Sequence, residues 1–326
     1  MSIASYLSAL VAQKNSLADN LVSMGVSAST SETLNTLVPK VLEISGGGSG
    51  DGLWAKIVDR TVTRVSDDKS AVTEIGRYAF YGCEMLTSVN FPAAVGVGPY
   101  AFALCSALNT VSLPVAGSIE ADAFYRCSAL SSVSFPSATA IGNAAFQSCS
   151  HLENVNMPLV EAIGSSAFAS CTALTEAVFP SASIISTAAF EYNTALQKAS
   201  FPEAVSVYAY AFRSCSALAD ISFPKVKEIG GNAFTSCIAL TTASFPMATT
   251  ISSSAFLNCY MLTSLYLLGS SFCSLLSKNA FNSTPIGGYS ASAGQEGSIY
   301  VPASLYSQYI ATGQAWWNFS SRIVSV

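Results

Sequence analysis

The chain has 326 residues, and its 19 acidic side chains against 14 Lys and Arg give a net charge of -5. So few cations disfavour binding to nucleic-acid phosphates and to anionic membrane surfaces. Hydrophobic residues make up 51% of the chain, a composition that would suit a membrane protein. A bilayer span needs about 20 consecutive apolar residues, however, and the long uncharged stretch 238–276 contains Pro246 and many Ser and Thr. We therefore predict no nucleic-acid partner and no membrane span.

The first 44 residues have the pattern of two helices. Apolar residues of the first helix alternate at spacings of four and three, with Lys14 at one a position of the heptad and Gly25 as the C-cap. Ser29 and Glu32 fit a capping box at the start of the second helix, which Pro39 must kink or begin. Three heptads are near the minimum for a coiled coil, so a small helical hairpin is an equal alternative. Residues 1–44 are predicted to dock the chain or to oligomerise it.

The N-terminus, from Met1 to Leu7, lacks the basic region and the continuous apolar region of a secretory signal peptide. If the chain is complete, we expect that it does not leave the cell by the general signal-peptide route.

A glycine-rich stretch, residues 45–52, follows the helical segment and has the composition of a flexible linker. Residues 53–74 then mix β-branched residues with polar alternation, from Trp54 to Arg64, which predicts strands. Because the first turn of a repeat array would otherwise expose its core, these strands are predicted to form an N-terminal cap.

The dipeptide Ala-Phe recurs every 22 residues, nine times, from Ala79-Phe80 to Ala255-Phe256. A fixed period of this size is typical of a solenoid, in which each turn stacks on the next. In the second turn the residues predicted to point inward are Val97, Ala101, Phe102, Cys105, Leu108, Val111 and Leu113. Because one turn buries too little apolar surface to offset its ordering entropy, no turn should fold alone.

One segment of each turn has the pattern of a strand. From Leu86 to Phe91, apolar residues at a period of two point inward, and Ser88 and Asn90 point outward. Stacking these segments gives a parallel β-sheet on one face. The segment from Ala79 to Cys83 is too short for more than one turn of helix on the other face.

The motif from Ile75 to Pro92 resembles the BspA-like family of bacterial leucine-rich repeats, and the resemblance extends over residues 70–326. It implies an α/β solenoid, a right-handed leucine-rich-repeat array with a parallel sheet on one face. The repeats would occupy residues 75–298 and a C-terminal cap residues 299–326, with a helix through Tyr306 and Tyr309. The first 44 residues are similar to a helical element at the start of many phage and prophage tail proteins.

Eight of the nine cysteines occupy one repeat position, and Asn193 replaces the cysteine in the sixth turn. A spacing of 22 residues gives a line of thiols in place of the close pairs of a zinc site, and parallel Cβ directions disfavour disulfides between neighbouring turns. We predict reduced, buried thiols that pack as small apolar groups, and no metal site. Cys273 lies outside this line and is predicted to be the most accessible cysteine.

His151, the only histidine, occupies a position that elsewhere holds Ala or Met, which predicts a partly covered side chain at the edge of the array. Cys149 is close in sequence, but it belongs to the inward line, and no third group is present to orient a Cys-His pair. Phosphate-binding loops and paired carboxylates are also missing from the pattern. We predict no catalytic residue, no cofactor and no enzymatic activity.

The outward positions of the strands are rich in Ser, Thr and Asn, with charge only near the middle of the array. Such a surface can hydrogen-bond a glycan or a protein. The candidate ligand-binding residues are Asn154, Asn156, Glu176, Lys198, Asp220 and Tyr266. The alternative for each of them is a solvated polar side chain with no ligand.

These observations predict a non-enzymatic binding or adhesion protein that presents its repeats to a cell-surface or host protein or glycan. It would be a prophage tail-associated or bacterial surface component, located on a virion, at the cell surface or outside the cell. Residues 1–44 would form a homo-oligomer or dock to another partner. The alternative is a structural spacer whose repeats set a shape and bind no specific ligand.

Overall fold

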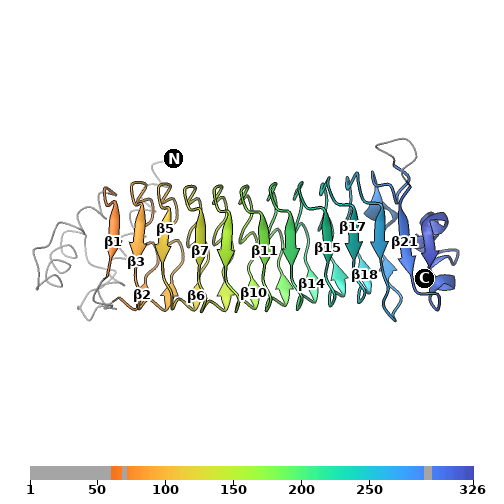
Figure 1. Cartoon of the computed structure of the whole chain (residues 1–326), viewed down its shortest axis with the longest axis horizontal. Helices are drawn as coiled ribbons and strands as arrows, with labels where there is room; N and C mark the ends of the chain where they lie inside the picture. The colour runs from red at the N-terminus through yellow and green to blue at the C-terminus, as the bar shows by residue number, and fades with distance from the viewer. Residues whose placement is uncertain (1–59, 68–71, 290–295) are drawn as a thin grey trace, which may run out of the picture.

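The protein is an elongated solenoid of about 11 turns with a repeat of about 22 residues (Figure 1). The structure is a computed structural model that describes residues 60–67, 72–289 and 296–326. The predicted repeat array is confirmed. The predicted helical segment 1–44, the linker 45–52 and residues 53–59 and 68–71 of the predicted N-terminal cap lie outside the described residues.

The longer strands lie side by side along one face of the solenoid (Figure 1). Their pairing is parallel and in register, so that Ser88 pairs with Thr110, 22 residues later. We call the outward side of these strands the strand face. Its strands are β1 (Arg64–Ser66), β3 (Ser88–Asn90), β5 (Thr110–Ser112), β7 (Ser132–Ser134), β9 (Asn154–Asn156), β11 (Glu176–Val178), β13 (Lys198–Ser200), β15 (Asp220–Ser222), β17 (Thr242–Ser244), β19 (Ser264–Tyr266), β21 (Ser298–Val301) and β22 (Ile323–Ser325).

The hydrogen-bonded pairing of this face is interrupted three times, between β5 and β7, between β9 and β11, and between β13 and β15. At each interruption the central apolar residue of the preceding strand is partly exposed, namely Val111, Val155 and Ala199. The equivalent residues of β3, β7 and β11 are buried. The interruptions therefore loosen the packing locally without shifting the register.

A second parallel sheet, which the sequence did not predict, holds ten strands of two residues each. In most of them the first residue is exposed or partly exposed and the second is buried, a pattern too short to distinguish from a loop. The strands are β2 (Glu74–Ile75), β4 (Gly96–Val97), β6 (Ser118–Ile119), β8 (Ala140–Ile141), β10 (Ala162–Ile163), β12 (Ile184–Ile185), β14 (Ser206–Val207), β16 (Glu228–Ile229), β18 (Thr250–Ile251) and β20 (Ser274–Leu275).

The segment equivalent to 78–83 in each turn, which we call the turn segment, contains no helix in the nine turns from 78–83 to 254–259. Two of its positions have left-handed backbone in each of these nine turns, as at Tyr100 (φ 58°) and Leu104 (φ 64°). Left-handed conformation costs a non-glycine residue about 1–2 kcal/mol. The amide of Tyr100 donates to the Ala121 carbonyl at 3.0 Å and that of Leu104 to the Tyr125 carbonyl at 2.7 Å, so bonds to the next turn hold this conformation.

The core is a set of columns in which each side chain packs on its equivalent in the next turn. The leucine column, which begins at Leu86 and ends at Leu262, is completely buried. The phenylalanine column runs from Phe80 to Phe281 with ring centroids 5.1–5.4 Å apart and interplanar angles of 1–11°. These are the inward positions that the sequence predicted.

The C-terminal residues close the array. β21 and β22 extend the sheet of the strand face, and α4 (Tyr306–Tyr309) lies where the sequence predicts a helix. The 3-10 helices η1 (Lys278–Phe281) and η2 (Ala315–Arg322) complete this end, where the rings of Trp316 and Phe319 lie 5.9 and 5.4 Å from that of Phe281. None of the helices in the described ranges is long and apolar enough to cross a membrane.

All nine cysteines are buried with free thiols. In the line of eight, Cys105 Sγ donates to the carbonyl of Phe80 in the preceding turn at 3.0 Å, and the later members repeat this contact. The expectation that Cys273 is accessible is wrong. Its amide donates to Tyr309 Oη at 2.9 Å and its carbonyl accepts from Trp316 Nε1 at 2.6 Å, so residues 36 and 43 positions later cover it.

Replacement of a column leucine should destabilise the protein far more than replacement of an outward serine. Leu174 is completely buried, so Leu174→Ala should lower the free energy of unfolding by about 2–5 kcal/mol through the cavity that it leaves. Ser222 is exposed on β15, and Ser222→Ala should change that energy by less than about 0.5 kcal/mol. Urea denaturation measures both values. Similar losses in the two variants would contradict the assignment of inward and outward positions.

Asn193 interrupts the line of thiols with a completely buried polar side chain. The nitrogen and the oxygen of its side-chain amide are both buried and have no hydrogen-bond partner. Because an unpaired buried polar group costs roughly 1–3 kcal/mol, Asn193→Cys should raise the free energy of unfolding by a similar amount. The reverse change one turn earlier, Cys171→Asn, should lower it. Denaturant titration of both variants tests the pair, and equal stability of Asn193→Cys and the wild type would contradict the expectation.

The thiols should be unreactive in the folded protein. Burial raises the pKa of Cys149 and Cys237 from 9.0 to about 12. Below about pH 9 these thiols are protonated in both the folded and the unfolded chain, so they leave the free energy of unfolding unchanged. Between about pH 9 and 12 they ionise only in the unfolded chain, so the free energy of unfolding falls as the pH rises. The midpoint of urea denaturation should therefore be constant below about pH 9 and fall above it.

At pH 8, a chromogenic thiol reagent should react with few groups before denaturation and with all nine cysteines after it.

Candidate functional site

Five of the six candidate residues lie on four successive strands of the strand face. Asn154 and Asn156 are on β9, Glu176 on β11, Lys198 on β13 and Asp220 on β15, and all five are exposed. The strands are regular because the apolar residue between each outward pair packs into the core, which fixes the direction of the outward side chains. We call these five residues the central polar patch.

The patch contains one ion pair and two hydrogen bonds to neighbouring turns. Lys198 Nζ lies 3.2 Å from Glu176 Oε2, and 59% and 57% of the two side chains are exposed. Asn156 Nδ2 donates to Ser134 Oγ at 3.2 Å, and Asp220 Oδ1 accepts from Thr241 Oγ1 at 3.3 Å. An ion pair this exposed adds little to stability. Its carboxylate and ammonium groups remain available to a ligand.

Tyr266, the sixth candidate, lies on β19, which β17 separates from β15. It is partly buried, and its ring stacks on that of Tyr300 in β21, with centroids 4.6 Å apart and an interplanar angle of 10°. Tyr300 was not predictable from the repeat because it follows Tyr266 by 34 residues and not by 22. The parallel pairing of β19 with β21 places Tyr300 directly beside Tyr266 despite this longer spacing. Tyr266 is thus separate from the central polar patch.

His151 is exposed, and the expectation of a partly covered side chain is wrong. Its Nδ1 atom lies 2.7 Å from the Ser128 carbonyl oxygen of the preceding turn and 3.3 Å from Ser150 Oγ. The side chain lies outside the core because its position is at the edge of the array. Cys149 is completely buried and protonated, so the two residues do not form a nucleophile and base pair. Within the described residues, no three His, Cys, Asp or Glu side chains gather as a metal site.

A shallow groove of about 530 Å³ lies where the turn segments lead into the strands. Hydroxyl side chains from successive turns line most of it, namely Ser106, Ser128, Ser148, Ser150, Ser170 and Thr172. Glu84, Leu104 and Arg126 complete the lining. We call it the hydroxyl groove. The groove was not predictable from the sequence because these positions belong to turns, and turns are commonly polar without binding anything.

In-register parallel strands, a buried leucine in nine successive turns and a regular outward face define a leucine-rich-repeat protein. The family model of the BspA type leucine rich repeat region matches residues 73–197 and 183–293, in six copies. The chain belongs to this family. Leucine-rich-repeat proteins of this bacterial surface type are typically non-enzymatic and protein-binding.

Solved structures of bacterial leucine-rich-repeat proteins are similar to the chain. A leucine rich cell surface protein of Faecalibacterium prausnitzii is 24% identical, over 81% of this chain and 79% of that one, with a TM-score of 0.45. The leucine rich repeat protein of T. pallidum is 27% identical, over 55% and 72%, with a TM-score of 0.40. A leucine-rich repeat protein of Eubacterium ventriosum is 17% identical, over 71% and 86%, with a TM-score of 0.46. No curated protein matches the chain.

Proposed function

We propose that the protein is a non-enzymatic binding protein whose central polar patch recognises a protein on a cell surface or host. The observation that carries the proposal is the ion pair of Glu176 and Lys198, in which both side chains are more than half exposed. The pair lies on the adjacent strands β11 and β13 at the middle of the strand face. The side-chain amides of Asn154 and Asn156 lie on one side of it and the carboxylate of Asp220 on the other.

A regular sheet with charge at its centre suits recognition of a protein surface. Opposite charges at fixed positions set the orientation of a partner and exclude partners with the wrong charge pattern. The protein-binding character that is typical of the family supports the same class of ligand. A glycan ligand, or a spacer role without a ligand, would appear as a different outcome of the binding experiment below.

The proposal extends to the setting of the protein. The repeats would be displayed on a bacterial surface or on a prophage tail, with residues 1–44 docking the chain to its carrier or joining copies of it. These parts of the proposal rest on the sequence alone. Removal of residues 1–50 would separate docking from ligand binding.

Exchange of the two charges tests the patch while it keeps the ion pair. The double variant Glu176→Lys with Lys198→Glu preserves net charge and pairing but reverses the direction of the pair. The full chain should bind a component of an array of cell-surface protein ectodomains. The exchanged variant should bind that component at least tenfold more weakly, which corresponds to about 1.4 kcal/mol.

A second exposed ion pair supplies the matched control. Lys225 Nζ and Glu203 Oε2 lie 2.6 Å apart, with 48% and 49% of the side chains exposed, in the loops that follow the strands. Exchange of these two charges should leave binding unchanged. Equal binding by both exchanged variants would place the ligand away from the patch. Binding only to glycan arrays would reassign the ligand class, and no binding to either array would favour the spacer.

A further inference from the structure

The hydroxyl groove has a regular arrangement of hydrogen-bonding groups that the proposed protein-binding patch does not use. Ser128 Oγ donates to the Ser106 carbonyl at 3.3 Å, and Thr172 Oγ1 donates to the Ser150 carbonyl at 3.2 Å. The protons of these two hydroxyls are thereby committed to the preceding turn. The oxygen lone pairs remain available as acceptors. The groove therefore offers hydroxyl oxygens that repeat at the spacing of the turns, over the four successive turns from Ser106 to Thr172.

An exposed aromatic ring continues this row beyond the groove. The Ser170 amide donates to the Glu191 carbonyl at 2.7 Å, which places Tyr192 next after Ser170 in the same repeat position. The Tyr192 side chain is 41% exposed. The Arg213 guanidinium carbon lies 5.4 Å from the centroid of its ring and 5.6 Å from that of Tyr210, within the range of cation–π attraction.

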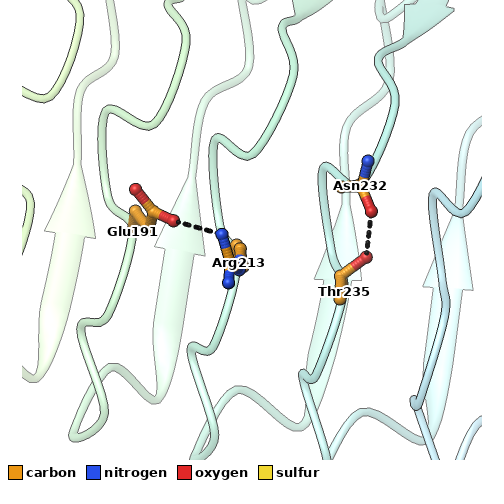
Figure 2. Close-up of polar contacts among 4 residues, drawn as sticks. All are labelled: Glu191, Arg213, Asn232 and Thr235. Atoms are coloured by element: carbon orange, nitrogen blue, oxygen red, sulfur yellow. Dashed lines mark hydrogen bonds and ion pairs between the residues drawn. The ribbon is translucent and has the colours of Figure 1, made fainter.

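Arg213 is itself fixed. Figure 2 shows its guanidinium directed at Glu191 of the preceding turn, and Nη1 lies 3.1 Å from Glu191 Oε1. Only 18% of the Glu191 side chain is exposed. The ion pair fixes Arg213, and Arg213 packs on the Tyr192 ring and restrains it, as a preformed aromatic surface should be held.

The turn that carries Tyr192 also departs from the rest of the core. Asn193, the next residue, replaces the cysteine of the regular line and leaves both polar side-chain atoms buried and unpaired. Departures from the regular pattern at the expense of stability are expected at functional positions. The aromatic residue and the irregular core position occur side by side in a single turn of the array.

The charges favour a neutral ligand. Glu84 and Arg126 are the only charged residues that line the groove, and their charges are opposite. Arg213 is neutralised by Glu191.

Rows of hydroxyl groups beside an aromatic ring match a sugar chain, because sugar hydroxyls donate to such acceptors and the apolar face of a sugar ring packs on an aromatic ring. The ring centroids of the phenylalanine column show a turn spacing of 5.2 Å in this part of the array. An extended β-1,4-linked glycan advances by a similar length per sugar ring.

We propose that the hydroxyl groove binds a linear, neutral, β-1,4-linked glycan along the axis of the solenoid, with Tyr192 stacking on a ring at one end. An extended peptide suits the groove less well. The Arg126 amide donates to the Gln147 carbonyl and the Ser148 amide to the Ala169 carbonyl, so the backbone groups of these turns are already paired and offer no edge for strand addition.

Calorimetric titration of the full chain with cellohexaose and with the hexamer of β-1,4-linked N-acetylglucosamine tests the proposal. At least one hexamer should bind, and its dimer should bind at least tenfold more weakly because it spans fewer turns. Ser148→Tyr should lower the affinity at least tenfold by filling the groove. The variant should fold, because Tyr192 occupies the same repeat position with φ 62°, the value found at Ser148. Tyr192→Ala should also lower the affinity at least tenfold.

Two controls separate this site from other surfaces. Tyr208 is 46% exposed one turn further on and does not line the groove, so Tyr208→Ser should change the affinity less than twofold. The charge exchange at Glu176 and Lys198 should also leave hexamer binding unchanged. The proposal is overturned if neither hexamer binds at millimolar concentration, if dimer and hexamer bind equally, or if Ser148→Tyr and Tyr192→Ala both bind like the wild type.

Discussion

Hydrogen bonds between neighbouring turns are the interaction on which this protein depends. They occur in three places, namely the short-strand sheet, the turn segment and, except at its three interruptions, the strand face. Because all three keep the same register of 22 residues, each side chain meets its own equivalent in the next turn. Phenylalanine rings therefore stack on phenylalanine rings, and thiols meet phenylalanine carbonyls. The buried columns must stay uniform, whereas the exposed columns are free to vary, and recognition can be encoded only there.

The columns were predictable from the sequence because a period repeated nine times leaves little ambiguity, and the leucines and phenylalanines are buried as their spacing predicts. The second sheet was not predictable, because two-residue strands carry no periodicity. The left-handed positions were hidden for another reason. Tyr100, Leu104 and Ser148 have no glycine-like signature, and bonds to the next turn hold their backbone. Cys273 was misjudged because the residues that cover it follow it by 36 and 43 positions.

The candidate site was only partly predictable. Alternation along a strand identifies outward residues, and the register then places Asn154, Glu176, Lys198 and Asp220 on neighbouring strands. Alternation does not reveal contacts between distant parts of the chain, so the stacking of Tyr300 on Tyr266 was missed. The hydroxyl groove was not predictable because a groove forms only where small side chains lie between larger ones in the folded chain. Serines in a turn therefore indicate a groove only when the positions of the larger residues beside them are known.

The orientation of the strands has a mechanical consequence. The strands lie across the long axis of the molecule (Figure 1), so tension between its ends pulls along the hydrogen bonds that join the turns. Force applied in this direction opens the turns one after another, starting from an end, because each turn contacts only its neighbours. A turn of 22 residues that is about 5 Å thick when folded lengthens to roughly 70–80 Å when extended. A chain anchored at one end and loaded at the other would therefore dissipate force in repeated equal steps and recover its length when the load is released.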